Sequence, residues 1–192
     1  MKISNTVLGI VAMAASPFLF IQMYLGGGGN TNQTGVCDLI YMTGWACVVI
    51  VLLRLHATGP GNRNKMILYI QLGTLSIAQA WNIWTIADPG NTSLLYRIMD
   101  FFWPISNITL LVAGIIIAVK GVLKGWNRYA VLIAGSWLPF SIIVFMLVGN
   151  GMGGIIISGI YSTIAWFGMG YMIWESRMET NAQLRESDVR PI

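Results

Sequence analysis

The sequence predicts an all-α membrane protein, a six-helix bundle built from three consecutive helical hairpins. Apolar residues make up 56% of the 192 residues and charged residues only 9%, whereas soluble domains carry about a quarter charged residues. Six stretches also have the roughly 20 apolar residues that a helix needs to cross a bilayer core. With so few charges available for a water-soluble surface, we expect one transmembrane domain over residues 1–174.

Each stretch is predicted to be helical because backbone groups in lipid have no water to bind. The predicted helices cover Thr6–Leu25, Cys37–Leu55, Lys65–Ile86, Tyr96–Val119, Tyr129–Val148 and Ile155–Trp174. The first resembles a signal peptide, but its apolar run continues without a break, and we expect a retained helix. Residues 175–192 are polar, and we expect a short cytoplasmic tail that frays beyond its first turns.

Lysine and arginine alternate between the loops. They precede the first helix, follow the second and fourth, and continue in the tail, whereas the other three loops hold only Arg97. This positive-inside pattern places both termini in the cytoplasm of a multi-pass cell membrane protein. It also explains the net charge of +4 without nucleic acid as a partner. The short inner loops fit a bacterial inner membrane.

The three outer loops are rich in glycine and asparagine, which favour tight turns. They are Gly26–Asn30, Asp88–Asn91 and Gly149–Gly151, and they predict that each helix pair forms a hairpin. The pairs recur at intervals of about 60 residues, with Asp38, Asp100 and Ser158 at matching places. This spacing suggests a degenerate three-fold internal repeat. The alternative is that hairpins of similar length repeat without common ancestry.

Proline and glycine predict local geometry within the helices. Pro17, Pro104 and Pro139 each remove a backbone hydrogen bond, so we expect kinks in the first, fourth and fifth helices. Glycines crowd the last hairpin and predict a surface where helices approach closely. They are Gly151, Gly153, Gly154, Gly159, Gly168 and Gly170.

Polar residues within apolar helices are the candidates for function, because they face the bundle or a cavity. Asp100, Trp103 and Asn107 share one helix face, and Asp38, Tyr41 and Trp45 repeat the spacing. The candidates for an outward-facing vestibule or substrate site are Asp100, Asp38, Trp103, Asn107, Asn82, Gln79, Trp81, Trp84, Tyr41 and Trp45. Asp100 is the leading candidate because we expect it to lie deepest among apolar neighbours.

The same residues have a structural interpretation. Arg97 lies three positions before Asp100 and could form an ion pair with it. The tryptophans and tyrosines could form an interfacial belt, and the amides could join helices by hydrogen bonds. Both interpretations remain open from the sequence.

Little in the sequence indicates catalysis or a cofactor. Cys37 and Cys47 lie about 15 Å apart along one predicted helix and cannot pair with each other. The single histidine, His56, falls in a predicted loop, so we expect no metal and no haem. No phosphate-binding loop, zinc-protease or serine-hydrolase motif is present.

Three functions remain, in order of preference. The first is a small channel or transporter for an ion or small solute. The second is a non-catalytic membrane subunit or scaffold that binds a partner protein, lipid or apolar ligand. The third is a lipid-modifying membrane enzyme that uses Asp100 or Asp38 as acid or base, although no nucleophile–base constellation supports it. Expected partners are membrane lipid and either a second copy or another membrane protein.

Overall fold

The computed structural model describes residues 3–26 and 31–189, with side chains for residues 3–26 and 34–175. All regular structure in these ranges is helical, as predicted. The helices are α1 (Asn5–Ala15), α2 (Phe18–Gly26), α3 (Thr31–Arg54), α4 (Asn62–Ala87), α5 (Leu94–Asp100), α6 (Phe102–Lys120), α7 (Asn127–Gly135), α8 (Trp137–Val148) and α9 (Met152–Val189). Residues 27–30, most of the first predicted outer turn, lie outside the described residues.

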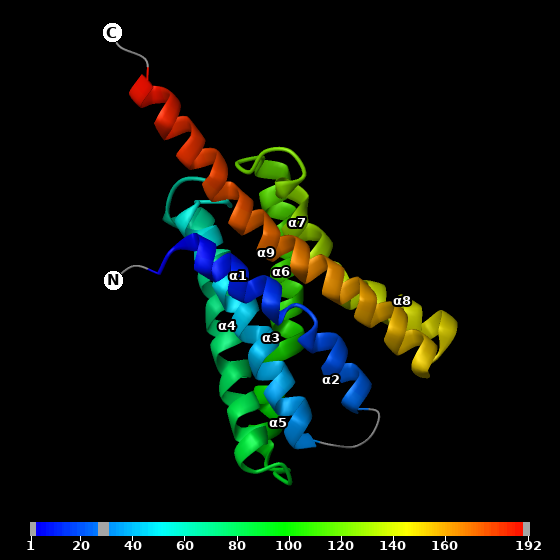
Figure 1. Ribbon diagram of the computed structural model, residues 1–192. Coiled ribbons are helices and arrows are strands. Elements are labelled where there is room, and N and C mark those ends of the chain that lie inside the picture. Colours follow the sequence, from blue (N-terminus) through cyan, green and yellow to red (C-terminus); the bar gives the residue numbers. More distant parts are fainter. Residues whose placement is uncertain (1–2, 27–30, 190–192) are drawn as a thin grey trace.

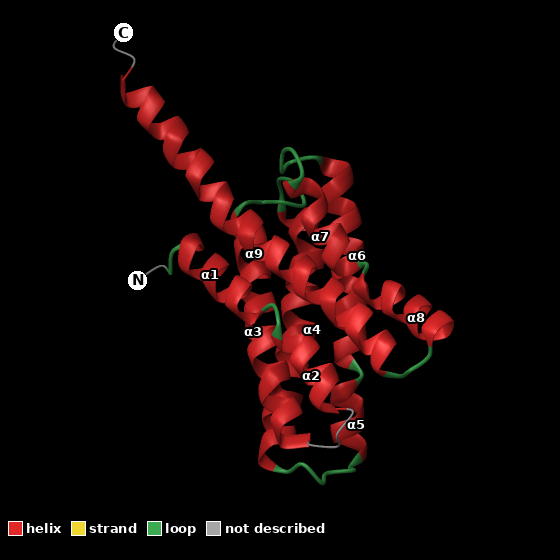
Figure 2. Ribbon diagram, turned by 45° about the vertical axis from the view of Figure 1, so that its right-hand side comes forward, coloured by secondary structure: helices red, strands yellow, loops and turns green. Residues whose placement is uncertain are grey.

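The helices form a bundle in which α9 crosses the others obliquely (Figures 1 and 2). Helix α3 packs against α1, α2 and α4, and α4 packs in turn against α6. Helix α9 packs mainly against α1, α2, α7 and α8. Helix α3 therefore connects α4 to the pair α1–α2, and α7 packs against both α6 and α9.

Three predicted helices are interrupted near their prolines, as the sequence indicates. Pro17 separates α1 from α2, and the carbonyl of Met13 accepts a hydrogen bond of 2.8 Å from the Ser16 hydroxyl. Pro104 and Pro139 each lie three residues after a break, at Phe101 and Ser136. The second of these breaks bends α7 against α8 by 46°. A proline cannot bond to the carbonyl four residues earlier, which accounts for breaks on its amino-terminal side.

Four stretches are long and apolar enough to cross a membrane, and the bent pair α7–α8 is a fifth if both helices form one span. The four are Asn5–Gly26, Thr34–Arg54, Leu94–Lys120 and Met152–Glu175. Helix α4, with 26 residues, is long enough but contains Gln71, Gln79 and Asn82, and it is not among the apolar stretches. The apolar helices suggest a multi-pass membrane protein with four or five spans in the described residues, where the sequence predicts six.

Close helix contacts involve glycines from several helices. A Cβ on Gly170 would lie 2.7 Å from the backbone nitrogen of Met13, so α9 approaches α1 closely there. Helices α6 and α7 meet at a reciprocal contact, where a Cβ on Gly114 or Gly135 would lie 2.6 Å from the facing backbone. Of the glycines predicted to pack tightly, Gly154, Gly159 and Gly170 do so, whereas Gly151 has open space around it.

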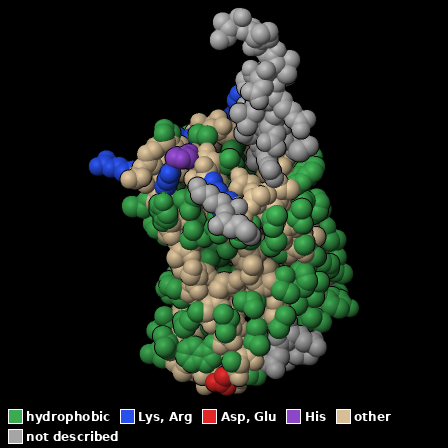
Figure 3. All heavy atoms as spheres, turned by 60° about the vertical axis from the view of Figure 1, so that its left-hand side comes forward, with side chains coloured by type: hydrophobic (Ala, Val, Ile, Leu, Met, Phe, Trp, Pro, Cys, Tyr) green, Lys and Arg blue, Asp and Glu red, His purple; other side chains and the backbone are tan. Residues whose placement is uncertain are grey.

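Charge separates the two ends of the bundle (Figure 3). At one end, the Arg54 guanidinium donates to the carbonyl of Ile3 at 2.8 Å and to Asn5 Oδ1 at 2.9 Å, which ties the start of α1 to the end of α3. At the opposite end lie Asp88, in the turn after α4, and Asp100, at the end of α5, with Arg97 as the basic residue of that helix. We call these the basic end and the acidic end.

The polar tail differs from the expectation that it frays beyond its first turns, because α9 continues as a helix through Val189.

Candidate functional site

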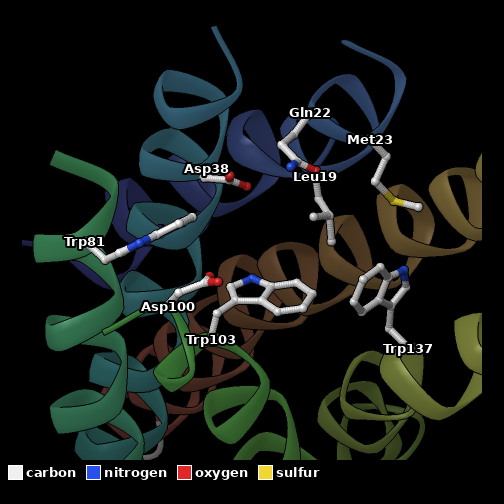
Figure 4. A pocket seen from close by; sticks show the side chains of 8 residues that line it. All are labelled: Leu19, Gln22, Met23, Asp38, Trp81, Asp100, Trp103 and Trp137. Carbon is white, nitrogen blue, oxygen red and sulfur yellow. The ribbon is translucent and has the colours of Figure 1, made fainter. Parts of the chain in front are cut away.

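A cavity of about 160 Å³ lies between helices near the acidic end. Its lining side chains come from α2, α3, α4, α5, α6 and α8, and they point into a common space (Figure 4). They are Leu19, Gln22, Met23, Asp38, Trp81, Asp100, Trp103 and Trp137. Four of the residues selected from the sequence, Asp38, Trp81, Asp100 and Trp103, therefore meet at one site.

Asp38 is the most unusual residue of the cavity. Only 9% of its surface is exposed, yet its carboxylate accepts no hydrogen bond and forms no ion pair with any residue in the described part of the chain. A buried charge is normally paired or hydrogen-bonded, because its transfer out of water costs several kcal/mol. A hydrogen-bond or charge partner for Asp38 therefore has to come from the cavity.

Asp100 reaches the cavity because the helix breaks next to it. Pro104 leaves the Asp100 carbonyl without its helical donor, and α5 ends at this residue. The side chain is exposed, so the expectation that Asp100 lies deepest among apolar neighbours is wrong. Apolar neighbours in sequence imply burial only in a continuous helix, and here the break leaves Asp100 at the cavity rim.

Helix α5 is positioned against α4 by Tyr96. The Tyr96 and Thr85 hydroxyls lie 2.7 Å apart and share a hydrogen bond. The Tyr96 ring also packs against Trp81 and Trp84, with centroids 5.4 and 5.9 Å away. Trp84 therefore supports the cavity wall without lining it, and Tyr96 sets the position of Asp100 relative to Trp81.

The expected ion pair between Arg97 and Asp100 is not formed. Arg97 lines a separate shallow groove with Ile98, Phe101, Phe102 and Ile105. Although residues three apart share a helix face, Arg97 lines this groove whereas Asp100 lines the cavity. No basic side chain lines the cavity, so the two carboxylates have no counter-charge there among the described residues.

Sequence reasoning missed one wall of the cavity. Leu19, Gln22 and Met23 share a face of α2, at spacings of three and four residues. Gln22 is the single amide in this apolar helix. An isolated polar residue of this kind indicates a helix face that points toward the bundle or a cavity. Trp137, from α8, carried no comparable signal, because its place depends on the bend at Ser136.

Behind the cavity, aromatic rings form a connected series through the core. Trp103 contacts Trp137 at 5.6 Å between centroids, and Trp137 contacts Trp166 at 6.4 Å. Trp166 then packs on Tyr41 and Trp45, both fully buried. The predicted candidates Tyr41 and Trp45 therefore belong to the packed core.

The predicted amides fall into a different group from the carboxylates. Gln79 Nε2 donates to the Leu39 carbonyl at 3.2 Å and to Thr43 Oγ1 at 2.9 Å, and Gln79 Oε1 accepts from Asn82 at 3.0 Å. The two bonds that Gln79 donates join α4 to α3, and the bond from Asn82 lies within α4. Asn107 donates to the Trp103 carbonyl at 3.0 Å, within its own helix. None of the three amides lines the cavity.

The cavity offers few groups for covalent chemistry. It has two carboxylates but no serine, cysteine, histidine or lysine. Elsewhere in the described residues, no group of three or more histidine, cysteine, aspartate or glutamate side chains is placed to hold a metal ion. What the arrangement can do is bind a positively charged group between acidic and aromatic side chains.

Comparisons with known protein families, with curated proteins and with solved structures find no match for this chain.

Proposed function

We propose that the chain is a small membrane channel or transporter whose binding site for a cation is the cavity at the acidic end. The observation that carries the proposal is the buried Asp38 carboxylate, which has neither a hydrogen bond nor an ion pair in the described structure. Asp100 adds a second carboxylate to the same cavity. Two like charges that line the same small cavity repel each other, and a bound cation reduces that repulsion.

The membrane setting strengthens this proposal. Ionisable residues in membrane spans are costly and mark ion or substrate pathways. By the positive-inside rule, the basic end faces the cytoplasm and the cavity faces outward. Its two carboxylates then attract cations from the outer solution, as acidic rings do in cation channels.

Further polar groups continue toward the basic end. The Oδ1 atom of Asn107 and both amide atoms of Gln71 are buried without a hydrogen-bond partner among the described residues. Gln71 lies eleven residues before Asn82 on α4, which is about 16 Å closer to the basic end. These amides are candidates for a polar path that leads inward from the cavity.

Electrical recording from the full chain in proteoliposomes tests the proposal. A concentration gradient of potassium, sodium or tetramethylammonium chloride is applied across the vesicles, and current is measured against cation concentration. We expect a saturable cation current that is lost in Asp38→Asn. The matched control is Asp88→Asn, because Asp88 is a carboxylate at the same end but outside the cavity, bonded to Asn91 at 2.8 Å.

Folding is checked for each variant by size-exclusion chromatography and thermal unfolding. Equal currents in Asp38→Asn and the unaltered chain would remove the carboxylate from the mechanism. Absence of any cation current from well-folded chain would overturn the transport proposal.

A second function, the non-catalytic membrane subunit, is favoured by two apolar grooves on the lipid-facing surface. One of about 350 Å³ lies where α1 and α2 meet α3, lined by Val11, Phe18 and Ile40 among others. Another, of about 460 Å³, lies on α9 beside Phe167 and Tyr171. Acyl chains or a partner helix fit such surfaces. Neither groove accounts for Asp38, so this function ranks second, and the lipid-modifying enzyme ranks third.

A further inference from the structure

We propose that the ligand of the cavity is an alkylammonium ion, a monovalent organic cation with apolar substituents on its nitrogen. This inference rests on the proposed cation site and names its substrate class. Apart from the two carboxylates and Gln22, the lining of the cavity is aromatic and aliphatic.

Three indole rings from three different helices, those of Trp81, Trp103 and Trp137, line the cavity with the carboxylates. Trp81 and Trp103 lie beside the two carboxylates, and Trp137 lies beyond Trp103 (Figure 4). Indole is the best aromatic partner for a cation, and cages of aromatic rings recognise quaternary ammonium groups. The position of each ring is set by its neighbours. Trp81 packs on Tyr96, and Trp103 packs edge-on against Trp137.

Trp137 is held most firmly of the three. Its Nε1 donates to the Ser158 carbonyl at 3.1 Å, and only 4% of its surface is exposed. The ring is also in contact with Trp166 behind it. Its hydrogen-bonding group is thus engaged away from the ligand, and the ring itself is what it offers to the cavity.

The rest of the lining suits alkyl groups better than a hydrated ion. Leu19, only 2% exposed, and Met23 provide an apolar surface on α2, and Gln22 is the single neutral polar side chain of the cavity. An alkylammonium ion has a charge for Asp38 and methyl or methylene groups for Leu19 and the indoles. Burial of each methylene group is expected to strengthen binding about fourfold.

The size of the cavity limits the ligand. A cavity of about 150 Å³ holds one benzene molecule, and the volume here is about 160 Å³. A cation with about five to eight heavy atoms therefore fits. Tetramethylammonium and choline are in this range.

The donor set argues against a divalent metal ion as the ligand. Calcium takes six to eight oxygen ligands, whereas the cavity side chains offer two carboxylates and one amide. The indole, leucine and methionine side chains that complete the wall supply no oxygen. They do supply the polarisable, weakly hydrated surface that an organic cation prefers.

Equilibrium dialysis of the full chain in detergent against radiolabelled choline tests this inference. Unlabelled competitors are tetramethylammonium, sodium, potassium, calcium and the neutral isostere of choline, in which carbon replaces the nitrogen. We expect saturable choline binding that tetramethylammonium displaces and that the neutral isostere and the metal ions do not. Because binding is measured without transport, the result is independent of the current recordings.

Three variants connect binding to the cavity. Asp38→Asn should weaken choline binding about 30-fold or more, and Asp88→Asn should leave it unchanged. Trp103→Phe should retain most of the affinity, whereas Trp103→Leu should weaken it about 5- to 30-fold, since a ring over a desolvated cation contributes that much. A second aromatic variant, Trp81→Leu, repeats the test if Trp103→Leu does not fold.

The outcomes separate this inference from the proposed function. Displacement of choline by its neutral isostere, or equal binding to Trp103→Leu and Trp103→Phe, overturns the alkylammonium assignment. Cation currents carried by potassium or sodium without choline binding would overturn it and leave the transport proposal standing. Choline binding without any current would support the assignment and overturn transport.

Discussion

The cavity lies near a second polar region, the amide junction, where Gln79 of α4 bonds to Leu39 and Thr43 of α3. The polar groups of the two regions differ in their hydrogen bonding. At the junction, both functional atoms of Gln79 are bonded within the protein. In the cavity, Asp38 is 9% exposed and has no such bond in the described structure. Both residues are polar side chains on helices of a membrane bundle, and their sequence neighbourhoods do not distinguish them.

The difference shows how structural and functional polar residues separate in a membrane bundle. A polar side chain that joins helices has its hydrogen bonds satisfied internally, and its value is stability. A polar side chain that binds a ligand keeps its bonding capacity for the ligand and is costly to bury without one. Gln79 has the features of a structural residue, and the cavity that Asp38 lines, together with its missing hydrogen bond, favours a role in ligand binding. A missing bond alone does not favour such a role, because the hydroxyl of the core residue Tyr41 also lacks a partner among the described residues.

The largest expected effect is a difference in cation affinity between variants of the two cavity carboxylates. Asp38 is buried and Asp100 is exposed, and a buried charge interacts more strongly because solvent screens it less. Asp38→Asn should weaken cation binding about 30-fold or more, and Asp100→Asn only about 2- to 5-fold, as expected for an exposed ion pair. Affinities from equilibrium dialysis at low and high salt measure both. A larger loss for Asp100→Asn would reverse the assignment of the main counter-charge.

A pair of matched glutamine substitutions gives the next largest effect. Gln79→Leu breaks the junction and should lower the free energy of unfolding by about 1–2 kcal/mol, with choline affinity changed less than about twofold. Gln22→Leu should do the opposite, since Gln22 lines the cavity on α2 and makes no hydrogen bond among the described residues. Thermal unfolding in detergent and dialysis are measured on both variants. Parallel effects of the two substitutions would show that Gln79 and Gln22 do not differ in role.

The smallest expected effect comes from Tyr96, which neither lines the cavity nor belongs to the amide junction. Removal of its hydroxyl in Tyr96→Phe breaks the 2.7 Å bond to Thr85 but keeps the ring between Trp81 and Trp84. We expect a loss of about 0.5–1 kcal/mol in stability and a loss of a few-fold in choline affinity, because α5 holds Asp100 less firmly. Tyr96→Leu, which also removes the ring, should weaken binding further. Identical affinities for the two variants would show that Tyr96 does not position the site.

The sequence predicts much of this site because polarity within an apolar helix is a local property. Asp38 and Asp100 stand out in their helices, and Trp103 follows Asp100 at a spacing that shares a face. The helix breaks at Pro17, Pro104 and Pro139 follow from local chemistry as well. The bundle class likewise depends only on composition and on the length of the apolar runs.

The rest of the site depends on tertiary packing, which sequence patterns do not contain. Leu19 and Met23 look like any lipid-facing residues until α2 is placed beside α3 and α9. Trp137 reaches the cavity only because α8 bends away from α7. The expectation that Asp100 lies deepest is wrong for the same reason, because the burial of a side chain depends on the helices that pack around it.

The length of α9 has a mechanical consequence for ligand binding. Its 38 residues extend about 57 Å, nearly twice the ~30 Å of a bilayer core. Along this length it packs against α2 and α8, which carry one wall of the cavity, while the carboxylates stand on α3 and α5. Because α2 also packs against α3, we expect a change in the tilt of α9 to shift mainly α8 relative to the two carboxylates. We therefore expect a force on the charged far end of α9 to change the width of the cavity.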